Sequence, residues 1–238
     1  ARCMSGVSEK NWKENFTISL SNWGSKVLKE KFGMESTVIF PPVTNNFPNV
    51  SWGERENGFV FIGRICPEKE VDKVIRIVKS VRENNINVHL HIIGRIDKRH
   101  SDYANYIKKF CNENNTWCFF EGETYGQKKL NFITTHKYGI SGRSNEPFGI
   151  AVAEMVNAGC IVFVPDGGGQ VEIVKDENLI YNDIGDAVNK IDRVLKDGAV
   201  QVELLSRLAL QTEKFPVEIF KKEIKKIIKD YFSYESKI

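Results

Sequence analysis

The chain has 238 residues, of which 41% are hydrophobic and 27% charged, so it can build a core of about one and a half domains and is neither disordered nor fibrous. The formal charge is only +3, which gives no overall field that would select nucleic acid. No apolar stretch reaches the roughly 18 residues that span a bilayer, and the first residues lack the apolar core of a signal peptide, so we expect a cytoplasmic protein.

The first 43 residues differ in pattern from the middle of the chain. Phe16–Leu20, Asn22–Phe32 and Thr37–Phe40 predict a strand, a helix and a strand, and Gly33 is a plausible helix C-cap. Pro41 and Pro42 then mark a boundary, because a proline keeps the preceding residue out of the helical conformation and cannot donate to a strand ladder. We therefore treat residues 1–43 as a separate part of the chain.

From about Gly58, short apolar runs alternate with longer amphipathic stretches. Continuous apolar runs predict buried strands, and apolar residues at helical spacing predict helices. Strands of this kind, separated by helices, indicate an α/β fold: a Rossmann-like, doubly wound parallel sheet over residues 44–213, with its binding crevice beyond the carboxyl ends of the strands. The predicted strands are 59–62, 88–93, 117–120, 138–141, 160–164 and 179–181, and the predicted helices are 71–81, 103–111, 127–134, 150–156, 171–174, 183–196 and 200–215.

Residues 214–238 predict a final amphipathic helix. One face would carry apolar residues from Val217 to Tyr231, and the opposite face would carry five lysines between Lys221 and Lys229. Such a helix can lie on a membrane surface, which would place the protein at the cytoplasmic membrane face, or it can pack on the protein with its lysines in water. The sequence leaves both interpretations open.

Cysteine and histidine give no recognisable metal or disulfide pattern. The five cysteines include no C-x-x-C pair, so we expect reduced structural thiols. His89 and His91 alternate with apolar residues and would share one face of a strand. Because no third ligand follows at a recognisable spacing, the sequence predicts no metal site.

Arg64 and Lys69 follow the strand that ends at Ile62 and precede a predicted helix. A guanidinium binds two oxygens through its planar fork and an ammonium adds a point charge, so this pair suits a pyrophosphate. Two surface charges in a turn remain an equal alternative.

Glu146 and Glu154 are separated by seven residues around a helix that we expect to begin near Pro147, a favoured first-turn residue. The amides of residues 148–150 would then be free to bind an anion. Glu154 lies in an otherwise apolar helix, where a carboxylate without a partner is costly, and this favours a ligand role over a surface charge.

Gly167, Gly168 and Gly169 follow another predicted strand. They permit a tight turn and the close approach of a ligand, or they form a turn only. The loop lacks the Walker lysine and the full G-x-G-x-x-G spacing, which disfavours a P-loop NTPase and a standard dinucleotide dehydrogenase.

Together the three loops resemble the retaining glycosyltransferases of family 4, which have the two-domain GT-B fold. Gly63 to Lys69, Glu146 to Glu154 and Gly168 to Glu172 stand in the order of that family, over about Ser19–Val174. The resemblance implies transfer of a sugar, with a lean towards mannose, from a GDP-sugar or UDP-sugar to a glycan or lipid-linked acceptor. It implies no cofactor and no metal, because the cationic pair would stabilise the leaving diphosphate.

The resemblance also implies roles for single residues. Arg64 and Lys69 would hold the donor diphosphate, and Glu146 would contact the donor sugar; these three are the implied catalytic residues. Glu154 would bind the nucleotide ribose. The remaining implied donor-binding residues are Pro147, Phe148, Gly149 and Ile150, which would meet sugar and phosphate, and Gly122 and Thr124, in a loop near the base.

The chain departs from the family pattern at three points. Glu70 stands where the family has a glycine, which predicts a narrower or recharged phosphate loop, and residues 141–145 replace a Pro-Ser pair, which predicts a different sugar pocket. The resemblance leads us to expect that the N-terminal acceptor domain of the family is missing, that residues 1–43 are its remnant with the interdomain segment, and that the chain alone is inactive. Two alternatives are a noncatalytic sugar-nucleotide-binding subunit that needs a separate acceptor-domain partner, and a sugar-nucleotide epimerase, which fits the two glutamates less well.

Overall fold

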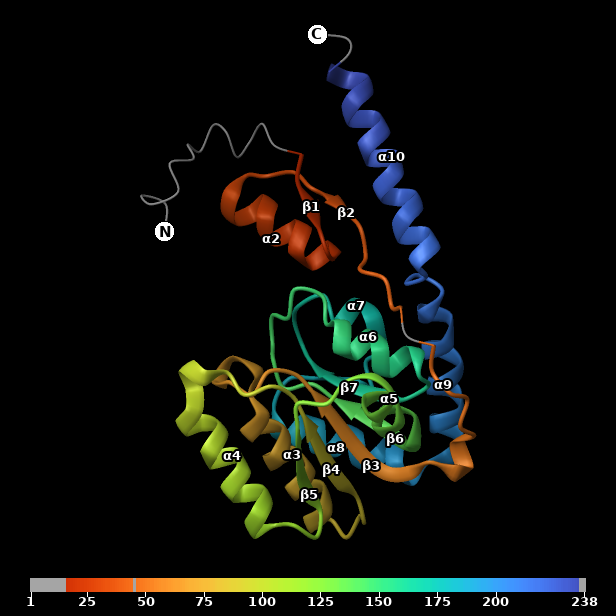
Figure 1. Cartoon of the computed structure of the whole chain (residues 1–238). Coiled ribbons are helices and arrows are strands. Elements are labelled where there is room, and N and C mark those ends of the chain that lie inside the picture. The colour runs from red at the N-terminus through yellow and green to blue at the C-terminus, as the bar shows by residue number, and fades with distance from the viewer. Residues whose placement is uncertain (1–15, 45, 236–238) are drawn as a thin grey trace.

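The computed structural model describes residues 16–44 and 46–235. A large sheet domain lies below a small N-terminal unit, and the last helix extends upward beside that unit (Figure 1). The strands are β1 (Ile18–Ser19), β2 (Thr37–Val38), β3 (Glu56–Ile62), β4 (His89–Ile93), β5 (Cys118–Gly122), β6 (His136–Ile140), β7 (Ile161–Pro165) and β8 (Ile180–Tyr181). The α-helices are α2 (Asn22–Phe32), α3 (Val71–Glu83), α4 (Ser101–Glu113), α5 (Gly126–Thr135), α6 (Ile150–Asn157), α7 (Val171–Val174), α8 (Ile184–Lys196), α9 (Gly198–Thr212) and α10 (Val217–Glu235), and the 3-10 helices are η1 (Trp52–Glu54), η2 (Pro67–Lys69) and η3 (Lys98–His100).

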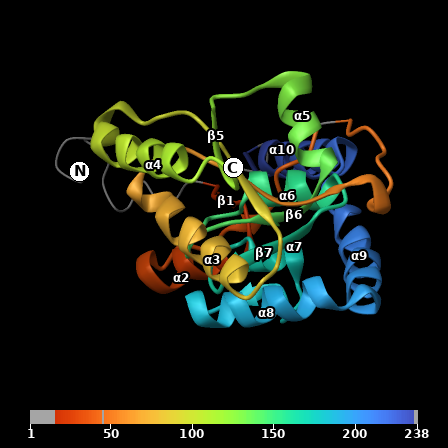
Figure 2. The same cartoon turned by 90° about the horizontal axis from the view of Figure 1, so that it is seen from below.

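The sheet has six strands in the order β5-β4-β3-β6-β7-β8, and each neighbouring pair is parallel. The chain runs from β3 outward to β5 and then returns to the other side of β3, so the direction of winding reverses between β3 and β6. Helices α3 and α8 cover one face of the sheet, and α5 and α6 cover the other (Figure 2). The predicted doubly wound α/β fold is confirmed.

The core explains why the apolar patterns predicted this fold. All five residues of β7 are buried, as expected for a strand covered on both faces. In α3 the buried residues recur at helical spacing and face the sheet. Four cysteines are buried free thiols, namely Cys66, Cys111, Cys118 and Cys160, as predicted; Cys3 lies outside the described residues.

The N-terminal unit has the predicted order, with shorter strands. Helix α2 begins and ends where the sequence indicated: the Ser21 side chain accepts a hydrogen bond from the Gly24 amide, and Gly33 takes a left-handed conformation with φ of 62°. Strands β1 and β2 have two residues each and pair in parallel.

Glu172 and Ser21 fix this unit to the sheet domain. The Glu172 carboxylate accepts hydrogen bonds from the backbone amides of Asn22 and Trp23, at 3.0 and 2.7 Å, at the positive end of α2. The Ser21 hydroxyl donates to the Pro147 carbonyl at 2.6 Å. The family-like segment at Glu172 therefore positions the N-terminal unit over the loop that contains Glu146.

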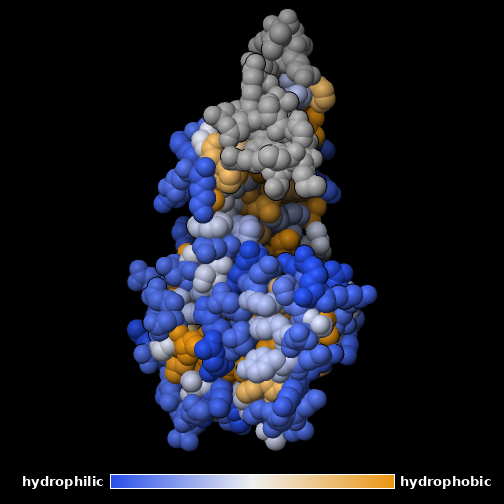
Figure 3. Space-filling model, turned by 90° about the vertical axis from the view of Figure 1, so that its left-hand side faces the viewer, coloured by the Kyte–Doolittle hydropathy of each residue, from blue (hydrophilic) through white to orange (hydrophobic). Residues whose placement is uncertain are grey.

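Helix α10 extends away from the sheet domain (Figure 1). Figure 3 shows hydrophobic residues in the upper part of the molecule, above the mainly hydrophilic surface of the sheet domain. Among the described residues, no helix combines the length and the apolar character that crossing a bilayer requires. The exposed large apolar side chains of this upper part are Phe16, Ile18, Leu20 and Phe32 in the N-terminal unit, and Ile219, Ile228, Tyr231 and Phe232 in α10.

Candidate functional site

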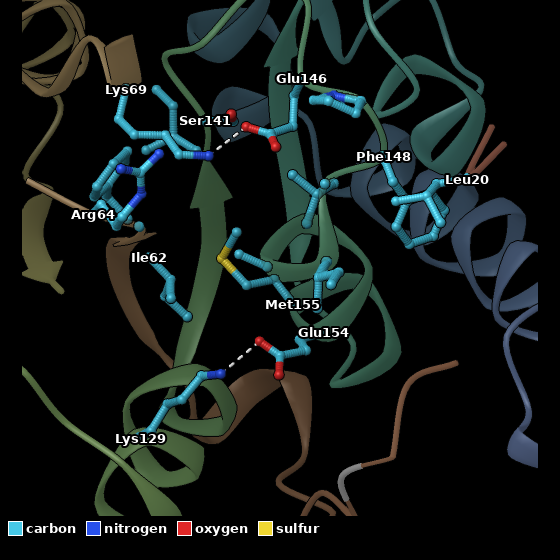
Figure 4. A pocket seen from close by; sticks show the side chains of 18 residues that line it. Leu20, Ile62, Arg64, Lys69, Lys129, Ser141, Glu146, Phe148, Glu154 and Met155 are labelled. Carbon is cyan, nitrogen blue, oxygen red and sulfur yellow. Dashed lines mark hydrogen bonds and ion pairs between the residues drawn. The ribbon is translucent and has the colours of Figure 1, made fainter. Parts of the chain in front are cut away.

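A cavity of about 480 Å³ opens at the carboxyl ends of β3 and β6. This is the reversal point of the sheet, where doubly wound domains bind their ligands. Figure 4 shows charged side chains at two ends of the cavity and Ile62 and Met155 between them. The lining residues come from the end of β3, η2, the end of β6, the 146–149 loop and α6, with Lys129 of α5 and Leu20 of the N-terminal unit.

Lys69 and Glu146 form the charged pair at one end of the cavity. The Lys69 ammonium lies 2.5 Å from a Glu146 carboxylate oxygen, and Arg143 lies 3.8 Å from the same oxygen. The side chains of Lys69 and Glu146 are 19% and 17% exposed, so their charges are only partly screened by water. Two cations around one carboxylate leave positive charge for an incoming anion.

Arg64 lies beside Lys69 at the same end of the cavity, on the side that faces Glu146 (Figure 4). Its guanidinium lies 3.2 Å from Asp97 and 3.6 Å from Glu68, and its side chain is 41% exposed. Hydrogen bonds from Arg99 hold the pKa of Asp97 well below its usual range, so this carboxylate stays charged at neutral pH and orients Arg64. Arg64 is thus held in place while part of its guanidinium can reach a ligand.

Glu70 has the backbone conformation that the family glycine would supply. Its φ is 50°, in the left-handed region that glycine adopts most easily. Its carboxylate lies 3.0 Å from the Lys73 ammonium, and Glu70 is not among the residues that line the cavity. The side chain therefore neither narrows the cavity nor leaves an unpaired negative charge beside it.

The loop before α6 decides between two expectations for the start of this helix. The helix begins at Ile150, as the apolar run 150–156 predicted, and not near Pro147, because Gly149 has a φ of 100° and interrupts the helical conformation. The Gly149 carbonyl accepts the first helical hydrogen bond, from Ala153, at 3.0 Å. The free amides at the start of α6 are consequently those of residues 150–152, displaced towards Glu154.

The glycine-rich loop supports Glu146. A Cβ at Gly168 would lie 2.5 Å from the backbone nitrogen and oxygen of Glu146, so only glycine permits this approach. The Gly169 amide donates to the Glu146 carbonyl at 2.8 Å, and Gln170 donates to the Arg143 carbonyl at 2.6 Å. The sequence could not separate a ligand-binding loop from a turn; the structure gives these glycines a positioning role.

Glu154 and Lys129 form the second charged pair, at the other end of the cavity (Figure 4). The Lys129 ammonium lies 2.6 Å from a Glu154 carboxylate oxygen, and the two side chains are 21% and 12% exposed. The carboxylate therefore has the partner that the sequence argument did not find. Lys129 was missed because no motif near it in the sequence indicates a ligand role. Helix α5, which lies on the same face of the sheet as α6, brings Lys129 to the cavity.

The predicted base-side residues lie outside this cavity. Gly122 lines a neighbouring cavity of about 850 Å³, which Arg64 also lines. Thr124 is buried and lines neither cavity. The predicted site residues that do surround the first cavity are Arg64, Lys69, Glu146, Pro147, Phe148, Gly149, Ile150 and Glu154.

A doubly wound parallel sheet with a charged cavity at its reversal point defines a Rossmann-like domain of the ligand-binding kind. Residues 43–215 match the family described as "Glycosyl transferases group 1", and the chain belongs to that family. This agrees with the resemblance seen in the sequence.

One curated relative is the "GDP-Man:Man(3)GlcNAc(2)-PP-Dol alpha-1,2-mannosyltransferase" of Dictyostelium discoideum. It is 24% identical over 221 residues, which cover 85% of this chain and 44% of that protein. The chain thus spans less than half the length of this relative.

Two solved structures share the fold. The sucrose-phosphate synthase of Thermosynechococcus elongatus has a TM-score of 0.78 and 20% identity, over 95% of this chain and 61% of that one. HepE of Anabaena, in complex with UDP and glucose, has a TM-score of 0.76 and 16% identity, over 94% of this chain and 68% of that one. At these identities the likeness supports the Rossmann-like GT-B architecture.

Proposed function

We propose that this chain is the donor-binding half of a retaining glycosyltransferase and that its first cavity binds a nucleotide-sugar. The observation that carries the proposal is the arrangement of one cavity with Arg64 and Lys69 at one end and Glu154 at the other. Membership of a glycosyltransferase family gives this arrangement its chemical meaning.

The diphosphate of the donor would lie between Arg64 and Lys69. Negative charge grows on the diphosphate as the bond to the sugar breaks, and cations already fixed in a partly dry site stabilise that charge without reorganising. Glu146 orients Lys69 before the donor binds, at 2.5 Å, and its second carboxylate oxygen would accept a hydrogen bond from a sugar hydroxyl. Arg64 and Lys69 would thus assist departure of the diphosphate, and Glu146 would orient both the cation and the sugar.

The ribose would lie at the opposite end, against Glu154. A carboxylate with two oxygens can accept from Lys129 and from a ribose hydroxyl at the same time. The free amides at the start of α6 lie between this end and the diphosphate, where a helix N-terminus favours negative charge.

The transferred sugar is proposed to be mannose, carried by GDP. The support is the printed name of the Dictyostelium relative, which is a GDP-mannose-dependent mannosyltransferase. The alternative carrier is UDP, which the Anabaena protein binds.

The acceptor, a glycan or a lipid-linked sugar, is proposed to bind through a further domain. Exposed apolar side chains in the N-terminal unit and on α10, such as Leu20 at 46% and Phe232 at 63%, offer a surface for such a domain. The five lysines of α10 are all exposed, which supports a place at the cytoplasmic face of a membrane.

Isothermal titration calorimetry with GDP-mannose and UDP-glucose tests the proposal. We expect one of them to bind, and Arg64→Ala to weaken it about tenfold to a hundredfold, since a hydrogen bond to a charged group contributes about 1.5–3 kcal/mol. The matched control is Arg193→Ala, which removes an exposed arginine of α8 that lines neither cavity. No binding heat with either donor, or equal losses in both variants, would contradict the proposal.

A further inference from the structure

Three histidines lie together on the sheet face that α5 covers, outside the donor cavity. His89 and His91 belong to β4 and His136 begins β6. One ring nitrogen of each lies within 4.8 Å of those of the other two. The third ligand that the sequence did not reveal lies 47 positions beyond His89, and the strand order brings it across β3.

Gly58 of β3 makes this meeting possible. It is the register partner of His89, and a Cβ at this position would lie 2.2 Å from His89 Nε2 and 2.6 Å from His136 Cδ2. Gly58 has no positive φ, so the site needs its missing side chain and not an unusual backbone conformation. The rings of His89 and His136 thus meet above Gly58, in the space that the side chain of any other residue would occupy.

Two of the rings have one nitrogen held by an acceptor. His91 Nδ1 donates to Glu121 Oε1 at 2.8 Å, and His136 Nδ1 donates to the Phe132 carbonyl at 2.7 Å, since these oxygens can only accept. In the neutral form of either ring the remaining nitrogen, Nε2, is the one that can bind an ion. This is the arrangement of metal-binding histidines, whose other nitrogen donates to a carboxylate or a backbone carbonyl.

The spacing of the nitrogens is close to that of a tetrahedral metal site. Zinc–nitrogen bonds of about 2.0–2.1 Å place two tetrahedral ligands roughly 3.3–3.4 Å apart. His89 Nε2 and His136 Nε2 lie 2.9 Å apart and share a hydrogen bond that an ion would replace, and the ligand nitrogens of all three rings lie within 4.8 Å of one another. A carboxylate oxygen of Glu56 lies 3.5 Å from His89 Nε2, and this side chain, which is 59% exposed, would have to turn towards His91 and His136 to act as a fourth ligand.

We propose that His89, His91, His136 and Glu56 bind a divalent transition-metal ion, with Zn²⁺ the best match to three imidazoles and a carboxylate. Four protein ligands define a structural site, so the ion would tie β3, β4 and β6 together at their amino-terminal halves. Glu121 would orient His91 from outside the coordination sphere. The inference is independent of the proposed donor site, because none of these residues lines that cavity.

Titration of Zn²⁺ into the chelator-treated chain tests the inference by calorimetry and thermal unfolding. We expect one Zn²⁺ per chain and a higher Tm with the metal, because an ion that binds only the folded state stabilises it. His91→Gln and His89→Gln should each weaken binding at least tenfold, and Glu121→Ala by about tenfold to a hundredfold. The matched control is His100→Gln, which removes a histidine outside the cluster and should bind as the wild type does.

Three results would overturn the inference: no uptake of Zn²⁺ by the wild-type chain, unchanged affinity in both His89→Gln and His91→Gln, or displacement of Zn²⁺ by equimolar Mg²⁺, which imidazoles bind poorly. Circular dichroism without metal shows whether each variant folds. If a histidine variant does not fold, Glu121→Ala and Glu56→Gln decide the matter, because they keep all three imidazoles, and wild-type affinity in both would contradict the site.

Discussion

Replacement of Glu154 by glutamine removes a charge from the cavity and keeps the shape of the side chain. The Glu154 side chain is only 12% exposed, and its carboxylate lies 2.6 Å from the Lys129 ammonium, so water cannot easily replace the interactions that the carboxylate makes. A hydrogen bond to a charged acceptor contributes about 1.5–3 kcal/mol and one to a neutral acceptor about 0.5–1.5 kcal/mol. The difference, about 1–2 kcal/mol for a ribose hydroxyl, predicts that Glu154→Gln weakens nucleotide binding about fivefold to thirtyfold.

A double-mutant cycle shows whether this loss arises at the ribose. Calorimetry would compare GDP with 2′,3′-dideoxy-GDP on the wild-type chain and on Glu154→Gln, and UDP with its dideoxy form if UDP is the nucleotide that binds. We expect the wild-type chain to lose affinity for the dideoxy nucleotide by a similar factor. The variant should distinguish the two nucleotides much less, which gives a coupling energy of about 1–2 kcal/mol.

The control is Glu113→Gln, which removes an exposed carboxylate 3.9 Å from Lys109 and should change neither affinity. The reasoning is refuted if the dideoxy nucleotide loses the same factor on both proteins, or if Glu154→Gln binds GDP as the wild type does. Glu154 would then serve only as the ion-pair partner of Lys129.

Two further predictions concern stability. A Cβ at Gly94 would lie 1.7 Å from the Gly63 carbonyl oxygen, so Gly94→Ala should lower the free energy of unfolding in urea by about 3 kcal/mol. The control is Gly53→Ala, where a Cβ would meet no atom within 4 Å and the change should be less than about 0.5 kcal/mol. Equal effects of the two substitutions would refute the clash. Burial raises the pKa of Tyr138 to about 12, so the folded state holds this proton more tightly than the unfolded state, and the stabilisation present below pH 10 is lost as the pH rises towards 12. Between pH 9 and pH 11.5 the free energy of unfolding should fall by about 2 kcal/mol less in Tyr138→Phe than in the wild-type chain. Equal decreases in both proteins would contradict a raised pKa of Tyr138.

Local signals in the sequence were sufficient for the individual elements. Helix α2 was predicted at its observed bounds because Ser21 caps its start and Gly33 ends it, and both signals act within one turn. The apolar spacing of residues 71–81 gave the buried face of α3. The doubly wound fold followed because the order of strands and helices restricts the topology.

Contacts between segments that are distant in the sequence could not be predicted from local patterns. The apolar run predicted the start of α6 at Ile150, as observed, but the argument from Pro147 placed it too early, because a proline favours the first turn of a helix and no local signal shows the positive φ of Gly149. Lys129 meets Glu154 only after α5 has crossed to the face of α6. His136 joins His89 and His91 only through the strand order, which no spacing along the chain expresses.

A crystal structure with bound GDP-mannose tests the central claim most directly. The account predicts that the diphosphate lies within hydrogen-bonding distance of Arg64 and Lys69, with the ribose against Glu154 and the sugar beside Glu146. A donor bound elsewhere on the chain, or bound in the cavity with its diphosphate away from both cations, would contradict it.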